Sequence, residues 1–414
     1  MIERTKKMTE IKGGITAPKG FKASGMYCGI RNNPNKKDLA LIVCDTKAAA
    51  AGVYTTNKVY GAPVGVTRKH ISENGYMKAA ICNSGNANTC NTDGYDKANA
   101  TCDALAKALD IKPEEVIVAS TGVIGQPLPL EPIISAIPTL VEALADTDEA
   151  SDAAARAIMT TDTVKKEVAY SFNIGEKEVR LAGIAKGSGM IEPNMATMLC
   201  FITTDANITP AMLQKALSAA VCDTFNMVSV DGDTSTNDTV TVMASGFAGN
   251  NIIDSENDDY KAFLDALMTL CTTMAKKIAK DGEGATKLLE CQVVNFNEVS
   301  GAKKLAKSVI RSSLVKAAMF GADANWGRIL CALGYSGVDF DPDLVDVWFL
   351  GNAGRLDVCK NGRGVPFDED FAKKLLSENE ITVICDMKCG DKCATAWGCD
   401  LTYEYVKING DYRT

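Results

Sequence analysis

Short apolar runs recur along the chain, some of them continuous and some alternating with polar residues. Runs of four to eight residues bounded by Gly, Pro, Asn or Asp are typical of β-strands, and the continuous ones indicate strands buried on both faces. The pattern predicts strands at residues 39–44, 77–82, 116–120, 167–172, 179–184, 198–203, 239–244, 292–297, 345–349, 381–385 and 400–408.

Between these runs, apolar residues recur with the spacing of amphipathic helices. One helix has a clear start signal, because Thr209 precedes Pro210 in the way that an N-cap residue precedes a proline in the first turn. The pattern predicts helices at residues 94–109, 131–145, 211–222, 258–279, 302–319 and 368–377. This mixture predicts an α/β or α+β fold with extensive sheet, whose doubly buried strands require helical layers outside.

Composition and charge narrow the class of protein. The 414 residues are 46% apolar and 23% charged, which is ordinary for a globular enzyme and long enough for two or three domains. The net charge of −8 argues against a nucleic-acid partner, which would require a basic surface. The charged N-terminus and the lack of a long apolar run predict a cytoplasmic protein without a signal peptide or membrane partner.

The chain has 15 cysteines, which suggest a disulfide framework until the context is considered. The odd count and the absence of a secretion signal favour reduced thiols. Cys385, Cys389, Cys393 and Cys399 lie close together, but their spacing does not match the paired knuckles of zinc sites.

Two further features could indicate a metal site or a catalytic histidine. The acidic segment 231–238 resembles a calcium loop, but Val242 stands where such a loop has its last Glu. We therefore read the segment as a polar turn, and we expect neither a metal nor a cofactor. His70 is the only histidine, and no partner motif accompanies it, so we expect it to be structural.

The most specific chemical signal is the dipeptide Ala196-Thr197, which lies in a loop rich in Gly, Pro and Asn. A small residue before a hydroxyl residue suits self-cleavage, in which the Thr197 hydroxyl attacks the Ala196 carbonyl. The product would carry Thr197 as a new N-terminus. Its α-amine, with an ordinary pKa of about 7.7–8.0, could then act as the general base for the hydroxyl of the same residue.

Ordered motifs occur along nearly the whole chain, at residues 81–88, 120–125, 159–163, 186–200, 229–239, 281–286, 321–328, 394–400 and 405–414. Together they resemble the ornithine acetyltransferase family, the glutamate N-acetyltransferases of arginine biosynthesis. A series of matches in the same order is much more specific than any single motif.

The resemblance implies stacked β-sheets sandwiched between helical layers, in a self-cleaving N-terminal-nucleophile fold. It implies an α chain of residues 1–196 and a β chain of residues 197–414, assembled as two α and two β chains. The implied reaction passes acetyl from N2-acetylornithine through Thr197 to glutamate by a ping-pong mechanism. Whether acetyl-CoA also serves as donor is left open, because the chain has no diagnostic motif for it.

The resemblance also implies roles for individual residues. Thr121 and Gly122 would form the oxyanion hole, although the residues alone indicate only a turn at the end of a strand. Lys186 would bind a substrate carboxylate, and Glu283 would receive the substrate ammonium group. The remaining substrate-binding residues, besides Thr197 itself, would be Thr160, whose neighbour Thr161 is an equally placed alternative, and Asn409 and Thr414 of the C-terminus.

Two other readings compete with acetyl transfer. An N-terminal-nucleophile aminopeptidase or amidase would cleave itself in the same way but pass its acyl group to water. A non-enzymatic amino-acid-binding protein would have no use for an intact Ala196-Thr197 junction or for Thr121-Gly122. The set formed by Lys186, Glu283 and the C-terminal residues favours an amino-acid acceptor over water.

Overall fold

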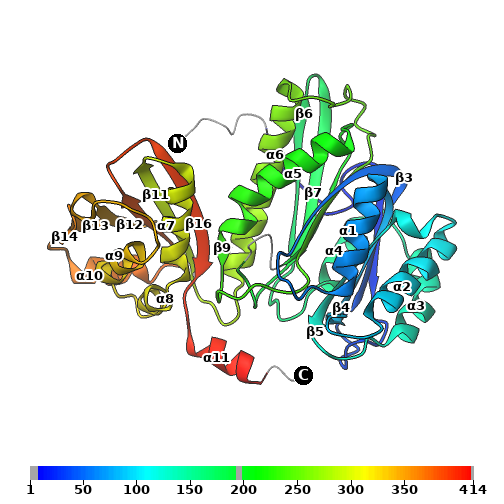
Figure 1. Cartoon of the computed structure of the whole chain (residues 1–414), viewed down its shortest axis with the longest axis horizontal. Helices are drawn as coiled ribbons and strands as arrows, with labels where there is room; N and C mark the ends of the chain where they lie inside the picture. Colours follow the sequence, from blue (N-terminus) through cyan, green and yellow to red (C-terminus); the bar gives the residue numbers. More distant parts are fainter. Residues whose placement is uncertain (1–7, 193–197, 412–414) are drawn as a thin grey trace. The chain divides into compact units, whose positions relative to one another are not determined.

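A computed structural model describes residues 8–192 and 198–411 of the chain. The structure divides into two compact units, and each unit is made of several separate segments of the sequence (Figure 1). Of the described residues, the first unit comprises 8–187, 198–226 and 233–274, and the second comprises 188–192, 227–232 and 275–411. No helix among the described residues combines the length and the apolar character needed to span a bilayer.

The first unit is built on a nine-stranded sheet with the order β1-β6-β7-β8-β10-β3-β4-β5, in which β2 also pairs with β3. Strands β4 and β5 are parallel, as are β8 and β10, and the remaining pairs are antiparallel. The strands are β1 (Thr9–Ile11), β2 (Phe21–Met26), β3 (Leu39–Tyr54), β4 (Tyr76–Asn86), β5 (Val116–Val123), β6 (Lys166–Ile174), β7 (Lys177–Lys186), β8 (Leu199–Thr204) and β10 (Thr239–Ala244).

Helices cover both faces of this sheet. The alternation of side chains in β3, β4 and β5 sends one set toward α1, α2 and α3 and the other set into a second core that includes α4. Helix α6 packs on β7, where Leu270 and Met274 lie over Gly183. The helices are α1 (Ala62–Asn74), α2 (Gly94–Leu109), α3 (Leu130–Glu142), α4 (Asp148–Ala157), α5 (Pro210–Asp223) and most of α6 (Asp258–Lys280).

The second unit contains a seven-stranded sheet with the order β14-β13-β12-β15-β11-β16-β9, in which β11 is parallel to β15 and β16 is parallel to β9. Its strands are β9 (Val228–Ser229), β11 (Leu288–Phe296), β12 (Asp346–Gly351), β13 (Gly354–Lys360), β14 (Arg363–Gly364), β15 (Glu380–Asp386) and β16 (Lys392–Cys399). Its helices are α7 (Val299–Arg311), α8 (Ser313–Phe320), α9 (Trp326–Gly334), α10 (Glu369–Leu376) and α11 (Tyr403–Gly410). Three short 3₁₀ helices, at Pro113–Glu115, Phe225–Met227 and Pro342–Leu344, complete the regular structure of the described residues.

The prediction of an α/β fold with sheets between helical layers is confirmed. Most predicted elements are present, and the predicted N-cap is real, because the Thr209 hydroxyl accepts a hydrogen bond from the Met212 amide at 3.3 Å. The predicted helix at 302–319 is two helices, since Ser312 ends α7 and caps α8. The strand predicted at 39–44 continues to Tyr54 through a run of alanines.

One predicted strand is wrong. Residues 400–408 lie largely in helix α11, and the preceding residues 392–399 form β16 instead. The apolar residues that suggested a strand are at the surface, with Tyr403 84% and Val406 70% exposed. They therefore give no evidence of a buried strand face.

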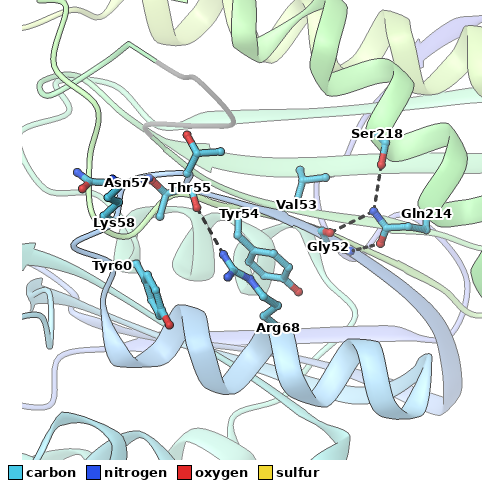
Figure 2. Close-up of a pocket in the computed structure, with 11 residues that line it drawn as sticks. Gly52, Val53, Tyr54, Thr55, Asn57, Lys58, Tyr60, Arg68, Gln214 and Ser218 are labelled. Atoms are coloured by element: carbon cyan, nitrogen blue, oxygen red, sulfur yellow. Dashed lines mark hydrogen bonds between the residues drawn. The ribbon is translucent and has the colours of Figure 1, made fainter.

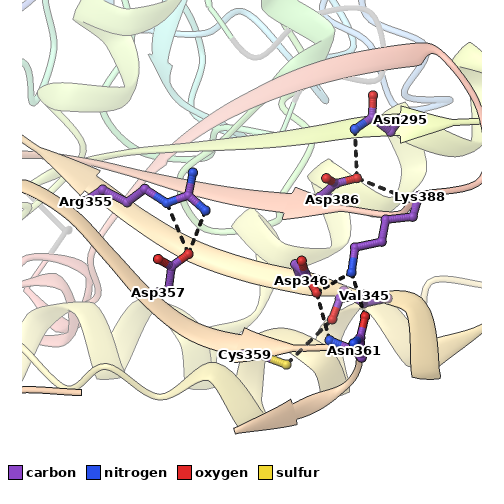
Figure 3. A network of polar contacts seen from close by, with 9 residues as sticks. All are labelled: Asn295, Val345, Asp346, Arg355, Asp357, Cys359, Asn361, Asp386 and Lys388. Atoms are coloured by element: carbon purple, nitrogen blue, oxygen red, sulfur yellow. Dashed lines mark hydrogen bonds and ion pairs between the residues drawn. The ribbon is translucent and has the colours of Figure 1, made fainter. Parts of the chain in front are cut away.

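Lys388 organises the turn that follows β15 in the second unit (Figure 3). Its ammonium group donates hydrogen bonds to Asp346 Oδ1 at 2.6 Å and to Asn361 Oδ1 at 2.7 Å. The Asp386 carboxylate accepts hydrogen bonds from the Lys388 amide at 3.1 Å and from Asn295 Nδ2 at 2.9 Å. This network joins the ends of several strands, so its polar residues have a structural role.

The four clustered cysteines occupy different environments in the same unit. Cys385 and Cys399 are buried in β15 and β16, whereas Cys389 and Cys393 are exposed. The pKa of Cys399 is raised by burial, and the nearby Lys316 ammonium opposes this shift. Cys385 and Cys399 thus serve as small buried side chains.

Candidate active site

The structure describes some of the residues predicted to carry the chemistry. Ala196, Thr197 and Thr414 lie outside the described residues. The first unit contains Thr121, Gly122, Thr160 and Lys186, and the second contains Glu283 and Asn409.

Thr121 and Gly122 lie at the C-terminal end of β5, beside the end of the parallel strand β4. Gly122 has φ +134, a conformation that side chains rarely adopt, and a Cβ there would lie 2.3 Å from the Gly85 carbonyl carbon. Position 122 therefore requires glycine for two reasons, the backbone conformation and the lack of space for a side chain. The result is a close backbone turn next to the Thr121 hydroxyl.

Asn237 holds this strand end in place from another part of the sequence. Its amide nitrogen donates to the Ser120 carbonyl at 2.9 Å and to the Ala87 carbonyl at 2.6 Å. Its amide oxygen accepts a hydrogen bond from the Thr89 hydroxyl at 2.7 Å. The sequence reasoning did not identify Asn237, although it lies within the matching segment 229–239.

Asp162 brings Thr160 and the end of β7 together. Its Oδ1 accepts hydrogen bonds from Lys166 Nζ at 2.6 Å and from the Gly187 amide at 2.7 Å, and its Oδ2 accepts one from the Thr160 amide at 3.0 Å. Burial by itself would raise the pKa of this carboxyl, but the charges of Lys166 and Lys186 and the Gly187 hydrogen bond lower it to about 2. Asp162 was also missed, and its signal was its place in the segment 159–163.

Further contacts connect this cluster with the oxyanion-hole candidates. Arg31 donates from Nη2 to the Thr160 carbonyl at 3.1 Å, and its side chain packs against Gly85, the residue that pairs with Gly122. Burial raises the pKa of the Cys82 thiol on β4, and the charge of Lys186 opposes this shift. The first unit thus gathers its four predicted site residues near the ends of β4, β5 and β7.

In the second unit, Glu283 and Asn409 are in direct contact. Asn409 Nδ2 donates to Glu283 Oε2 at 2.7 Å, so two residues 126 positions apart in the sequence form one pair. The Glu283 amide donates to the Ser188 carbonyl at 3.0 Å, and only 6% of Glu283 is exposed. Glu283 is therefore not the solvated turn residue that its type alone would suggest.

Two glycines allow this close packing. A Cβ at Gly189 would lie 2.2 Å from the Glu283 carboxyl carbon. A Cβ at Gly284, which has φ +69, would lie 2.7 Å from the Tyr405 amide nitrogen of α11. Gly189 and Gly284, the latter in the Gly282-Glu283-Gly284 turn, thus leave room for the Glu283 carboxylate and for the C-terminal helix.

Asp231 fixes the backbone that precedes the predicted cleavage junction in the sequence. Its carboxylate accepts hydrogen bonds from the Met190 amide at 2.6 Å and the Ile191 amide at 2.7 Å. The neighbouring Val230 amide donates to the Ile191 carbonyl at 2.6 Å. The acidic segment is therefore an anchor for a loop, and the use of Asp231 was not predicted.

Glu192, the residue after Ile191, is also held by contacts with its neighbours. Its carboxylate accepts a hydrogen bond from the Ser229 hydroxyl at 3.0 Å and pairs with Arg311 at 2.8 Å and Lys307 at 3.7 Å. Burial lowers the pKa of Lys307, and the Glu192 charge opposes this shift. Residues 190–192, which precede the junction in the sequence, are thus held by hydrogen bonds and ion pairs.

His70 has the position expected of a structural histidine. It is 7% exposed on α1, and its Nδ1 lies 2.8 Å from the Val116 carbonyl oxygen of β5. The ring therefore connects a helix with the sheet.

Comparison with known proteins shows the family. A model described as the ArgJ family matches residues 22–414. The chain is 52% identical to the arginine biosynthesis bifunctional protein ArgJ 1 of Clostridium acetobutylicum over 97% of both chains. It is 50% identical to the arginine biosynthesis bifunctional protein ArgJ of Caldanaerobacter subterraneus subsp. tengcongensis, over 98% of this chain and all of that protein.

The chain belongs to the ArgJ family. The prediction of an acetyl-transferring enzyme of arginine biosynthesis is confirmed at this level. Among solved structures, the chain is similar to the ornithine acetyltransferase of Mycobacterium tuberculosis complexed with ornithine. That likeness has 38% identity and a TM-score of 0.43, and covers 46% of this chain and all of that one.

Proposed function

We propose that the chain transfers acetyl from N2-acetylornithine to glutamate through an acetyl-Thr197 intermediate. The observation that supports this most directly is the intact Ala196-Thr197 junction in a chain that matches the ArgJ family over residues 22–414. The Thr197 hydroxyl attacks the acetyl carbonyl, the amide C–N bond breaks, and the departing ornithine amine takes a proton. The glutamate α-amine then attacks the acetyl ester, which releases N-acetylglutamate and restores the Thr197 hydroxyl.

The nucleophile is made by the chain itself. The Thr197 hydroxyl attacks the Ala196 carbonyl, and the peptide bond is exchanged for an ester with a free α-amine on Thr197. Water hydrolyses the ester and leaves an α chain of residues 1–196 and a β chain of residues 197–414. The freed amine then serves as the base for the hydroxyl of the same residue, so no histidine is required.

The other site residues bind the substrate and stabilise charge. Thr121 and Gly122 donate hydrogen bonds to the developing oxyanion, a role that the close turn at the end of β5 favours. Lys186, which is 7% exposed, binds a substrate carboxylate. The Glu283 carboxylate receives the substrate ammonium group and is oriented by Asn409. Thr160 and Thr414 complete the substrate contacts.

The broader setting follows from the family and the composition. We propose that acetyl-CoA is a second acetyl donor, in agreement with the name bifunctional protein that the relatives carry. We also propose that two α and two β chains assemble and that the enzyme works in the cytoplasm, where its thiols stay reduced.

A paired assay tests this function. Purified protein is incubated with glutamate and either N2-acetylornithine or acetyl-CoA, and N-acetylglutamate is measured with time. Transfer from acetylornithine supports the proposal, and transfer from acetyl-CoA supports the second donor. An aminopeptidase or amidase would instead release acetate or an amino acid at a rate independent of glutamate, which would overturn the proposal.

A further inference from the structure

A pocket of about 570 Å³ opens beside β3 in the first unit, at the place where β4 no longer pairs with that strand (Figure 2). The pairing of β3 with β4 ends at Ala49, whereas β3 itself continues to Tyr54. Residues of β3, α1 and α5 line the space (Figure 2). Of the proposed site residues that the structure describes, Thr121, Gly122, Thr160, Lys186, Glu283 and Asn409, none is among the lining residues.

The wall of the pocket is preformed. The Gln214 side chain of α5 accepts a hydrogen bond from the Gly52 amide at 3.0 Å and donates one to the Gly52 carbonyl at 3.2 Å. It also donates to the Ser218 hydroxyl at 3.1 Å. The first two bonds satisfy the backbone amide and carbonyl of Gly52 at this open edge of β3, where a neighbouring strand would otherwise pair.

Arg68 of α1 is held at the pocket by two tyrosine rings. Its guanidinium carbon lies 5.2 Å from the centre of the Tyr54 ring and 5.3 Å from that of Tyr60, and its Nη2 donates to the Thr55 carbonyl at 3.4 Å. Tyr54 can adopt its position because residue 52 is glycine, since a Cβ there would lie 2.2 Å from the Tyr54 hydroxyl oxygen. The guanidinium is thus positioned by stacking and leaves N–H groups for another acceptor.

The pocket has the charge of an anion site. Lys58 lies on its rim, so two cations line it, and no carboxylate is among the described residues that line it. In the described part of the chain, neither Arg68 nor Lys58 forms an ion pair with an acidic side chain. Hydroxyl and amide groups supply the rest of the polar lining. The chain as a whole has a net charge of −8, whereas this pocket is positively charged. Its two cations favour the binding of a doubly charged anion.

We propose that this pocket binds a small dianion, a phosphate ester or a dicarboxylate, with its charge held by Arg68 and Lys58. A guanidinium matches the oxygen geometry of both groups, and a phosphate ester carries about −1.5 to −2 charges at neutral pH. The pocket volume lies within the usual range for small-molecule sites. This proposal rests on the described lining residues and does not depend on the proposed acetyl transfer.

Calorimetric titration of the intact protein tests the site with glycerol 3-phosphate, a phosphate ester, and, in a second arm, with glutarate, a dicarboxylate. We expect saturable binding of at least one probe, and the stronger probe identifies the class of anion. Arg68→Gln should weaken binding about tenfold or more, because it removes charge-assisted hydrogen bonds. Arg68→Lys, which keeps the charge, should retain part of the affinity, and Lys58→Gln should weaken it less than Arg68→Gln.

Lys69→Gln is the matched control, because Lys69 is an exposed neighbour on α1 that does not line the pocket. The melting temperature of each variant shows that it is folded. Absence of saturable binding to the wild-type protein would overturn the proposal. Equal weakening by Arg68→Gln and Lys69→Gln would also overturn it.

Discussion

Asn409 donates a hydrogen bond of 2.7 Å to Glu283, and this pair joins the C-terminal helix α11 to the Gly-Glu-Gly turn. Asn409 also donates to the Tyr405 carbonyl at 3.0 Å, which orients its amide. The pair gives the Glu283 side chain a fixed direction and leaves its carboxylate oxygens able to accept further hydrogen bonds. A residue near the end of the chain therefore controls a predicted substrate-binding group.

Asn409→Ala should reduce kcat/KM for the amino-acid substrate much more than it reduces stability. The loss of a hydrogen bond to a charged group costs about 1.5–3 kcal/mol, which corresponds to roughly 10–150-fold. Lys407→Ala is the control, because Lys407 is an exposed residue of the same helix. Steady-state kinetics measures kcat/KM for both variants. If both values were equal to that of the wild type, Asn409 would have no role in substrate binding.

The wild-type chain should be found as two fragments of 196 and 218 residues, since 414 minus 196 is 218. Thr197→Ala should remain a single chain without transfer activity, and Thr197→Ser should keep part of both activities, because serine retains the hydroxyl and the amine. Intact-mass spectrometry and the acetyl-transfer assay measure these outcomes. Normal processing of Thr197→Ala would mean that the nucleophile is another residue.

Asp231→Asn should slow self-cleavage by about tenfold or more, because the carboxylate that holds two backbone amides loses its charge. Asp231→Glu keeps the charge and should recover part of the rate. The measurement is a time course of freshly made protein on a gel, and the melting temperature shows whether the fold is intact.

Asp339→Asn serves as the control for this variant, since Asp339 is exposed in the same unit. If the wild type is processed and Asp231→Asn is processed at the same rate, Asp231 has no positioning role. If the wild type is not processed at all, the self-cleavage proposal itself is wrong.

The buried Asp162–Lys166 pair should make stability depend on pH in acid. The pKa of Asp162 falls from 3.8 to about 2 on folding, so its contribution is present above about pH 4 and is lost as the pH falls toward 2. Asp162→Asn removes the negative charge from the fully buried pair that Asp162 forms with Lys166, which should cost about 3–5 kcal/mol at neutral pH.

Denaturant unfolding of the wild type and Asp162→Asn between neutral pH and pH 2 measures this difference. We expect the gap between the two free energies of unfolding to narrow as the pH falls below 4. A gap that is constant over this range would show that the Asp162 carboxyl does not titrate as its contacts require.

Several parts of the structure could be predicted from the sequence because their signals are local. Helix α2 spans residues 94–109 as predicted, and β10 spans 239–244, since the period of apolar residues reports directly on which face is buried. The ordered motifs led to the correct family. By contrast, residues 400–408 have an apolar pattern too, and only their exposure in the folded chain shows that they form no buried strand.

The contacts that support the site were decided by tertiary structure alone. Asp162, Asn237 and Asp231 each hold a backbone segment through hydrogen bonds, and Asn237 reaches residues more than 100 positions away. No local period encodes such a pair, because its partners meet only when strands distant in sequence become neighbours in the fold. The sequence by itself determined the elements, the family and the candidate nucleophile, whereas packing decided which carboxylates are buried, what they hold and what their pKa values become.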